Sequence, residues 1–151
     1  MEQDRLATLT DWKRRALQRV AESMPEEIEE VDKIVGKPMG RPASAAFRTA
    51  DIVGIDTFVH VAKNCFDALP KDEERAVFEV PAWMQQLVAD GRTGQKAGAG
   101  FYKKAGPEIS VLDLKTMAYR AQNKVRFASL GEVKGIEEAG PRLAALVRQE
   151  D

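Results

Sequence analysis

The spacing of apolar residues predicts a chain that is mainly helical. Apolar positions recur every three or four residues in most segments, and Gly36, Gly54 and Gly91 follow three of these segments as stop signals. Asp56 is predicted to be the N-cap of the helix that follows it. The predicted helices span residues 3–24, 25–35, 43–53, 57–69, 71–79, 81–90 and 139–150.

The periodicity changes after Gly100. The stretches "FYKK", "EISVLDL" and "MAYRA" are short, rich in aromatic or β-branched residues, and separated by "AGP" and "KT". Such runs with turn residues between them are typical of neighbouring antiparallel strands. The pattern as a whole therefore predicts a mainly α fold with a small β-meander near the C-terminus.

The segment "GRTGQKAGAGFYKK" at 91–104 is rich in glycine and lysine, as phosphate-binding loops are, so it is a candidate nucleotide site. A P-loop needs Gly-Lys-Ser/Thr, but Gln95 follows Gly94. A dinucleotide fingerprint needs a third glycine where Lys103 stands. The predicted order is helix, glycines and strand, which is the reverse of a Rossmann turn. The residues therefore favour a helix C-cap at Gly91 and a turn-rich link into a strand.

Composition narrows the classes of function. The chain has 151 residues, 44% of them hydrophobic, and a net charge of −1, so neither nucleic acid nor a membrane is expected as a partner. A weaker alternative is nucleic-acid binding through a face with Arg14, Arg15 and Arg19. Cys65 is the only cysteine, and we expect it to be a buried thiol. His60 is the only histidine, and we expect it to be a surface residue. No catalytic residue, cofactor-binding residue or metal ligand is predicted.

Two segments resemble the C-terminal domain of 3-hydroxyacyl-CoA dehydrogenases. Residues 31–66 resemble the start of that domain, which carries Val-Asp, Gly-x-Pro-x-Gly-x-Pro and Asp-x-Val-Gly-Leu-Asp-Thr patterns. Residues 91–104 resemble its end, Gly-x-x-Gly-x-Lys-x-Gly-x-Gly-Phe-Tyr. The linker "GRPASAAFRTAD" and the tail "EISVLDLKTMAYR" look like the branch of long, multidomain bacterial β-oxidation enzymes. The matching positions are Val31, Asp32, Gly36, Pro38, Gly40, Pro42, Asp51, Val53, Gly54, Ile55, Asp56, Thr57, Gly91, Gly94, Lys96, Gly98, Gly100, Phe101 and Tyr102.

The resemblance implies a fold and a division of the chain. The fold is a helical bundle of the 6-phosphogluconate/3-hydroxyacyl-CoA dehydrogenase C-terminal type, over residues 25–104. Residues 1–24 would form a helix that departs from the family, because they lack its Asn-Arg pair and are more polar. Residues 105–151 would form the meander and a terminal helix.

The resemblance also implies a function. The family oxidises 3-hydroxyacyl-CoA to 3-ketoacyl-CoA, and its NAD site and catalytic His–Glu pair lie on an N-terminal Rossmann domain that no residue here matches. We therefore expect the acyl-CoA-side and dimerisation domain of an NAD-dependent enzyme of fatty-acid β-oxidation. This chain would lack the NAD-binding domain, bind no cofactor itself and show no turnover alone. The expected partners are acyl-CoA, the missing NAD-binding domain and further copies of the chain, in the cytoplasm.

Three apolar residues in the family-like loops are predicted to line the substrate: Met39, Phe47 and Phe101. Core packing is the competing interpretation for each of them. The alternative for the whole chain is a non-enzymatic helical module for interaction or oligomerisation that has kept the fold.

Overall fold

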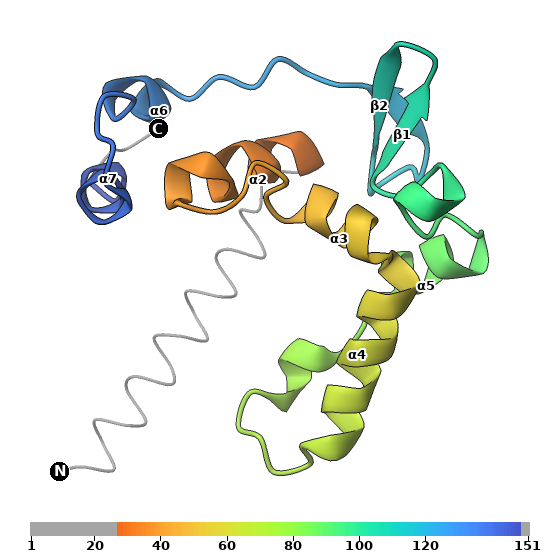
Figure 1. The fold of residues 1–151 in the computed structure, drawn as a ribbon. Coiled ribbons are helices and arrows are strands. Elements are labelled where there is room, and N and C mark those ends of the chain that lie inside the picture. The colour runs from red at the N-terminus through yellow and green to blue at the C-terminus, as the bar shows by residue number, and fades with distance from the viewer. Residues whose placement is uncertain (1–26, 149–151) are drawn as a thin grey trace, which may run out of the picture.

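The structure, a computed structural model, describes residues 27–148, and the helix predicted at 3–24 lies outside them (Figure 1). Its helices confirm the mainly α prediction, and its three strands confirm the β-meander. The helices are α2 (Ile28–Val35), η1 (Lys37–Met39), α3 (Phe47–Val53), α4 (Ile55–Ala68), η2 (Arg75–Phe78), α5 (Ala82–Ala89), η3 (Gln95–Ala97), α6 (Ala128–Glu132) and α7 (Ala139–Leu146). The strands are β1 (Tyr102–Ala105), β2 (Glu108–Leu112) and β3 (Tyr119–Ala121).

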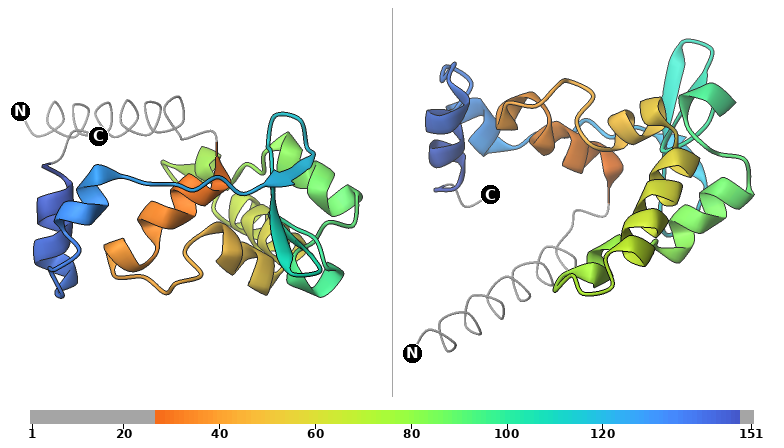
Figure 2. Two further views of the ribbon diagram at one scale, coloured as in Figure 1. Left: turned by 90° about the horizontal axis from the view of Figure 1, so that it is seen from above. Right: turned by 60° about the horizontal axis from the view of Figure 1, so that its bottom comes forward.

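The chain leads from α2 through the other helices to the sheet, and its last part then leads back to the neighbourhood of α2. From α2 it passes through α3 into the long helix α4, and α5 lies alongside α4 (Figure 2). The sheet follows α5, and an extended stretch then leads back past α2 to α6 and α7 (Figure 1). Helix α7 contacts η1, so the C-terminal end of the described chain meets the segment just after α2.

The sheet is antiparallel in the order β1-β2-β3. Tyr102 pairs with Val111 across the first pair of strands, and Val111 pairs with Arg120 across the second. The predicted boundary between residues 25–104 and 105–151 falls inside β1, and this division of the chain stays a prediction.

One hydrophobic core joins the helices to the sheet. Its members come from α2, α4, α5, β2 and the residue before β1, whereas the buried Val133, just after α6, lies outside this cluster. The buried residues of this cluster are Ile28, Ile55, Met84, Leu87, Phe101, Val111 and Leu112. Within residues 27–148, no helix is long and apolar enough to cross a membrane.

The start of α4 differs from the prediction. The helix begins at Ile55, and Asp56 lies in its first turn, where its carboxylate binds the Lys96 ammonium group at 2.7 Å. Gly54 takes the cap position with a φ of 104°, a value that favours glycine. The Ile55 N–H donates to the carbonyl of Thr93 at 3.0 Å. A contact distant in sequence therefore replaces the side-chain cap that the local pattern predicted.

Other boundaries also differ. Helix α3 starts at Phe47 rather than 43, and only Arg75–Phe78 of the predicted helix at 71–79 is helical, as one 3₁₀ turn. Helix α6 was not predicted, because five residues that include a glycine carry little periodic signal.

The glycine-rich segment closes over a carboxylate of the chain itself. Asp51 is only 6% exposed, and its two carboxylate oxygens accept the N–H groups of Phe101 and Tyr102, each at 2.8 Å. A Cβ added at Gly100 would lie 2.1 Å from Asp51 Oδ1, and one at Gly94 would lie 2.4 Å from the Asp51 carbonyl oxygen. These glycines are needed because the backbone passes so close to Asp51. The segment links α5 to β1, as predicted.

Replacing Gly100 with alanine should destabilise the fold. The added methyl group has no room between Asp51 and Gly94, so we expect Gly100→Ala to lower the free energy of unfolding by about 3 kcal/mol or more. The control is Gly131→Ala, where a new Cβ meets nothing within 4 Å and the change should stay within about 1 kcal/mol. Urea denaturation followed by circular dichroism would measure both, and equal stability of the two variants would contradict the packing argument.

Candidate functional site

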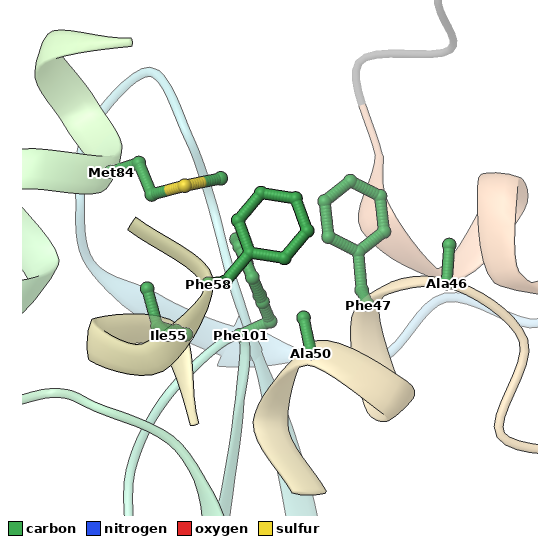
Figure 3. A pocket seen from close by; sticks show the side chains of 7 residues that line it. All are labelled: Ala46, Phe47, Ala50, Ile55, Phe58, Met84 and Phe101. Carbon is green, nitrogen blue, oxygen red and sulfur yellow. The ribbon is translucent and has the colours of Figure 1, made fainter. Parts of the chain in front are cut away.

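An apolar pocket of about 150 Å³ lies between α3, α4, α5 and the residue before β1 (Figure 3). The rings of Phe47 and Phe101 meet edge to face, with centroids 4.7 Å apart, and Trp83 contacts Phe101 in the same way at 5.9 Å. The lining residues are Ala46, Phe47, Ala50, Ile55, Phe58, Met84 and Phe101. None of these side chains titrates, so the pocket can bind an apolar group but offers no acid or base.

Asp32 positions the helix that carries Phe47. Its Oδ1 accepts the N–H groups of Ala46 at 3.0 Å and Phe47 at 2.7 Å, and its Oδ2 accepts that of Arg48 at 3.1 Å. These donors lie at the start of α3, where a helix leaves its N–H groups without internal partners. A carboxylate on α2 therefore caps α3 from a distance and orients Phe47 toward the pocket.

Tyr102 joins Asp32 to the segment that carries Phe101. Its hydroxyl donates to Asp32 Oδ2 at 2.9 Å, and the Arg48 guanidinium lies over its ring at 4.1 Å. Burial and the charge of Asp32 raise the pKa of Tyr102, so the phenol keeps its proton and acts as the donor.

Asp51 forms the second anchor of this segment. Burial raises the pKa of its carboxyl group, and the two main-chain donors of Phe101 and Tyr102 act against that rise. Its role in the described contacts is to hold the main chain, since both oxygens face those donors rather than the pocket. The two carboxylates, Asp32 and Asp51, therefore fix the positions of Phe47 and Phe101.

Residues 8–104 match the family described as "3-hydroxyacyl-CoA dehydrogenase, C-terminal domain". The chain belongs to this family. The match includes both segments that suggested the resemblance, and the helical fold with its small antiparallel sheet is consistent with this C-terminal domain.

Individual proteins similar to the chain also carry the name of this dehydrogenase family. The chain is 42% identical over 125 residues to a protein of Bacillus subtilis (strain 168) named as a probable 3-hydroxyacyl-CoA dehydrogenase. It is 39% identical over 97 residues to a protein of Deinococcus radiodurans with the same name. These matches cover 83% and 64% of the chain but only 16% and 27% of the two relatives. The chain thus spans a small part of each relative, and no solved structure matches it significantly.

The three predicted substrate-lining residues of this dehydrogenase domain lie in two places. Phe47 and Phe101 line the same apolar pocket, although Phe101 is also a core residue with 1% exposure. Met39 lies at the end of η1, is 39% exposed, and does not line that pocket. Their role in substrate binding stays a prediction.

The sequence interpretation missed other lining residues. Five further residues complete the pocket, and only the helical periodicity around Phe58 and Met84 could have indicated any of them. The five are Ala46, Ala50, Ile55, Phe58 and Met84. Phe58 is 49% exposed, so the pocket is open to solvent beside this residue of α4. No group of residues within 27–148 is arranged to hold a metal ion.

Removing the Asp32 carboxylate should loosen α3. Asp32→Ala leaves the first N–H groups of this helix and the Tyr102 hydroxyl without their acceptor, so we expect a loss of about 2–4 kcal/mol in the free energy of unfolding. Asp67→Ala on α4 removes a carboxylate whose pair with Lys63 is exposed, and should change stability by less than about 1 kcal/mol. Chemical denaturation of both variants measures the difference, and a loss no larger at Asp32 than at Asp67 would disprove the distant cap.

Proposed function

We propose that this chain is the acyl-CoA-side and dimerisation domain of an NAD-dependent 3-hydroxyacyl-CoA dehydrogenase of fatty-acid β-oxidation. The observation that carries the acyl-binding role is the apolar pocket around Phe47 and Phe101. Except for Met84, the residues that line it belong to the two segments that resemble the start and end of the family's domain. Each methylene group buried there would contribute about 0.8 kcal/mol to binding.

The redox step needs a held nicotinamide and a base near the substrate hydroxyl. The sequence contains no dinucleotide fingerprint, and in residues 91–104 the main-chain N–H groups of Phe101 and Tyr102 donate to Asp51. We therefore assign the NAD site to residues outside this sequence. A relative from Rickettsia prowazekii, 26% identical over 110 residues, is named as a fatty acid oxidation complex trifunctional enzyme, which supports the assignment to β-oxidation.

The dimerisation role is supported by large apolar side chains that are exposed. Ile52 and Val53 at the end of α3 and Val61 on α4 are 62%, 54% and 53% exposed. Exposed apolar surface is typical of protein contacts, and we propose that these three residues contribute to the dimer interface. The same residues would also serve the alternative, a non-enzymatic oligomerisation module, so the acyl pocket is what distinguishes the two functions.

Two assays test the acyl-binding role. The chain alone, mixed with NADH and acetoacetyl-CoA, should show no loss of NADH absorbance, and clear turnover would place the NAD site within this sequence. An acyl thioester of N-acetylcysteamine, which has no nucleotide, should bind the chain and change the fluorescence of Trp83, because Trp83 contacts a pocket ring.

Filling the pocket should weaken this binding. Ala50→Leu places a larger side chain among the lining residues, and we expect about tenfold weaker binding of the acyl thioester. Ala89→Leu on the exposed side of α5 is the matched control and should bind as the unchanged chain does. Equal affinity of the two variants would leave the non-enzymatic module as the better proposal.

A charge at one of these exposed apolar positions should separate the protomers. We expect Val61→Asp to raise the dissociation constant of the dimer about tenfold or more, because burying the carboxylate in the interface is unfavourable. His60→Asp, at an exposed neighbouring position on α4, should leave the dimer intact. Analytical ultracentrifugation over a range of concentrations measures both, and a chain that stays monomeric throughout would rule out the dimerisation role.

A further inference from the structure

Two segments of the chain carry positive charge without any carboxylate. Residues 33–50 and residues 114–131 each contain four cationic residues and no Asp or Glu. The cationic residues are Lys33, Lys37, Arg41, Arg48, Lys115, Arg120, Lys124 and Arg126. Since the whole chain has a net charge of −1, its acidic residues are concentrated elsewhere.

The fold places these two segments side by side. The extended stretch 122–127, between β3 and α6, runs along α2 and the loop that follows it (Figures 1 and 2). Glu29 on α2 holds this stretch: it accepts the main-chain N–H of Asn123 at 2.9 Å and binds the Arg120 guanidinium at 2.6 Å. A second link joins the Asn123 side chain to Glu27 at 2.7 Å.

A groove lies between the two segments. Three hollows of about 590, 500 and 640 Å³ are neighbours, because the first two share Lys33 and Arg126 and the last two share Arg48 and Tyr102. We call this surface the basic groove, after the cationic side chains that line it. These are Lys33, Lys37, Arg48, Lys104, Lys124 and Arg126.

The carboxylates in its walls are all engaged inside the protein. Asp32 accepts four donors, Asp51 accepts two main-chain N–H groups, and Glu29 accepts Arg120 and Asn123. Arg48 lies over the Tyr102 ring and donates to Gln122 at 3.4 Å. The other lining cations form no ion pair with any residue in the described range, namely Lys33, Lys37, Lys104, Lys124 and Arg126. Six cations therefore face three carboxylates in the groove.

This chemistry fits a small ligand with several phosphates. Guanidinium groups bind phosphate through paired hydrogen bonds, and lysines add point charges around it. The hollows are in the size range of small-molecule sites, about 300–1,000 Å³. Val125, Phe127 and Ile109 give the walls apolar surface that a nucleobase could contact. A nucleic-acid duplex fits less well, because the wall carboxylates would repel a continuous line of phosphates.

We propose that the basic groove binds the phosphate-bearing nucleotide end of coenzyme A. The choice of coenzyme A rests on the proposed function, because acyl-CoA is the substrate expected there. Lys37 and Pro38 of η1 line one end of the groove, next to Met39, the predicted substrate-lining residue that lies outside the apolar pocket. The pyrophosphate and the 3′-phosphate would lie among Lys33, Lys124 and Arg126.

Calorimetric titration of the chain with free coenzyme A at low ionic strength tests this site. Free coenzyme A should bind, dephospho-CoA should bind at least about threefold more weakly because it lacks the 3′-phosphate, and added salt should weaken both. The double variant Lys124→Ala/Arg126→Ala should bind coenzyme A at least about tenfold more weakly. Lys63→Ala is the control, because Lys63 is an exposed cation on α4 away from the groove, and it should change the affinity less than about twofold.

Other results would overturn the proposal. These are no binding of coenzyme A at millimolar concentration, equal binding by the double variant, or NAD binding as tightly as coenzyme A. The double variant should keep the melting temperature of the unchanged chain, since both side chains are exposed and form no ion pair in the described structure. Free coenzyme A has no acyl group, whereas the acyl thioester of N-acetylcysteamine has no nucleotide. Failure of the groove and failure of the acyl pocket are therefore separate outcomes.

Discussion

The arrangement of this domain depends on the carboxylate of Asp51. A buried carboxylate is costly unless donors replace the water it has lost, and here the N–H groups of Phe101 and Tyr102 do so, each at 2.8 Å. Because these donors are main-chain groups, the bonds fix the backbone of the glycine-rich segment against α3. Gly94 and Gly100 allow the approach, since a side chain at either position would collide with Asp51.

The contact between Asp51 and the glycine-rich segment lies between the apolar pocket and the basic groove. Successive residues of an extended chain point to opposite sides, so Phe101 enters the apolar pocket while Tyr102 turns toward Asp32. On α3, Phe47 lines the pocket and the next residue, Arg48, lines the basic groove. An apolar site and a cationic site thus share one support, and a change at Asp51 would disturb both.

Local pattern was enough to predict some of these elements. The helical spacing around Ile28 and around Met84 and Leu87 predicted α2 and α5, and the change of period after Gly100 predicted the strands. These elements follow from which face of a helix or strand is buried, and that information is local. The prediction that 91–104 is a turn-rich link from a helix into a strand also agrees with the structure, although the reason for its glycines lies fifty residues away, at Asp51.

The two helix starts that were predicted wrongly, those of α3 and α4, depend on distant contacts. Helix α3 starts at Phe47 because Asp32 accepts its first N–H groups, and α4 starts at Ile55 because that residue donates to Thr93. No local pattern around residue 43 or Asp56 contains this information. The same limit applies to the site, where Phe47 and Phe101 were predicted separately but only the fold brings their rings within 4.7 Å.

The net charge of the sequence does not reveal how charges are distributed over the folded protein. A net charge of −1 argues against a strong field around the whole protein, but a bound phosphate responds to charges within about one Debye length, roughly 10 Å. Near the basic groove the carboxylates are engaged by internal donors, while other acidic residues lie around η2, at the far end of α4 (Figure 1). A neutral average therefore does not exclude a cationic site. What decides the local field is which carboxylates the fold places at the groove and how many cations surround them.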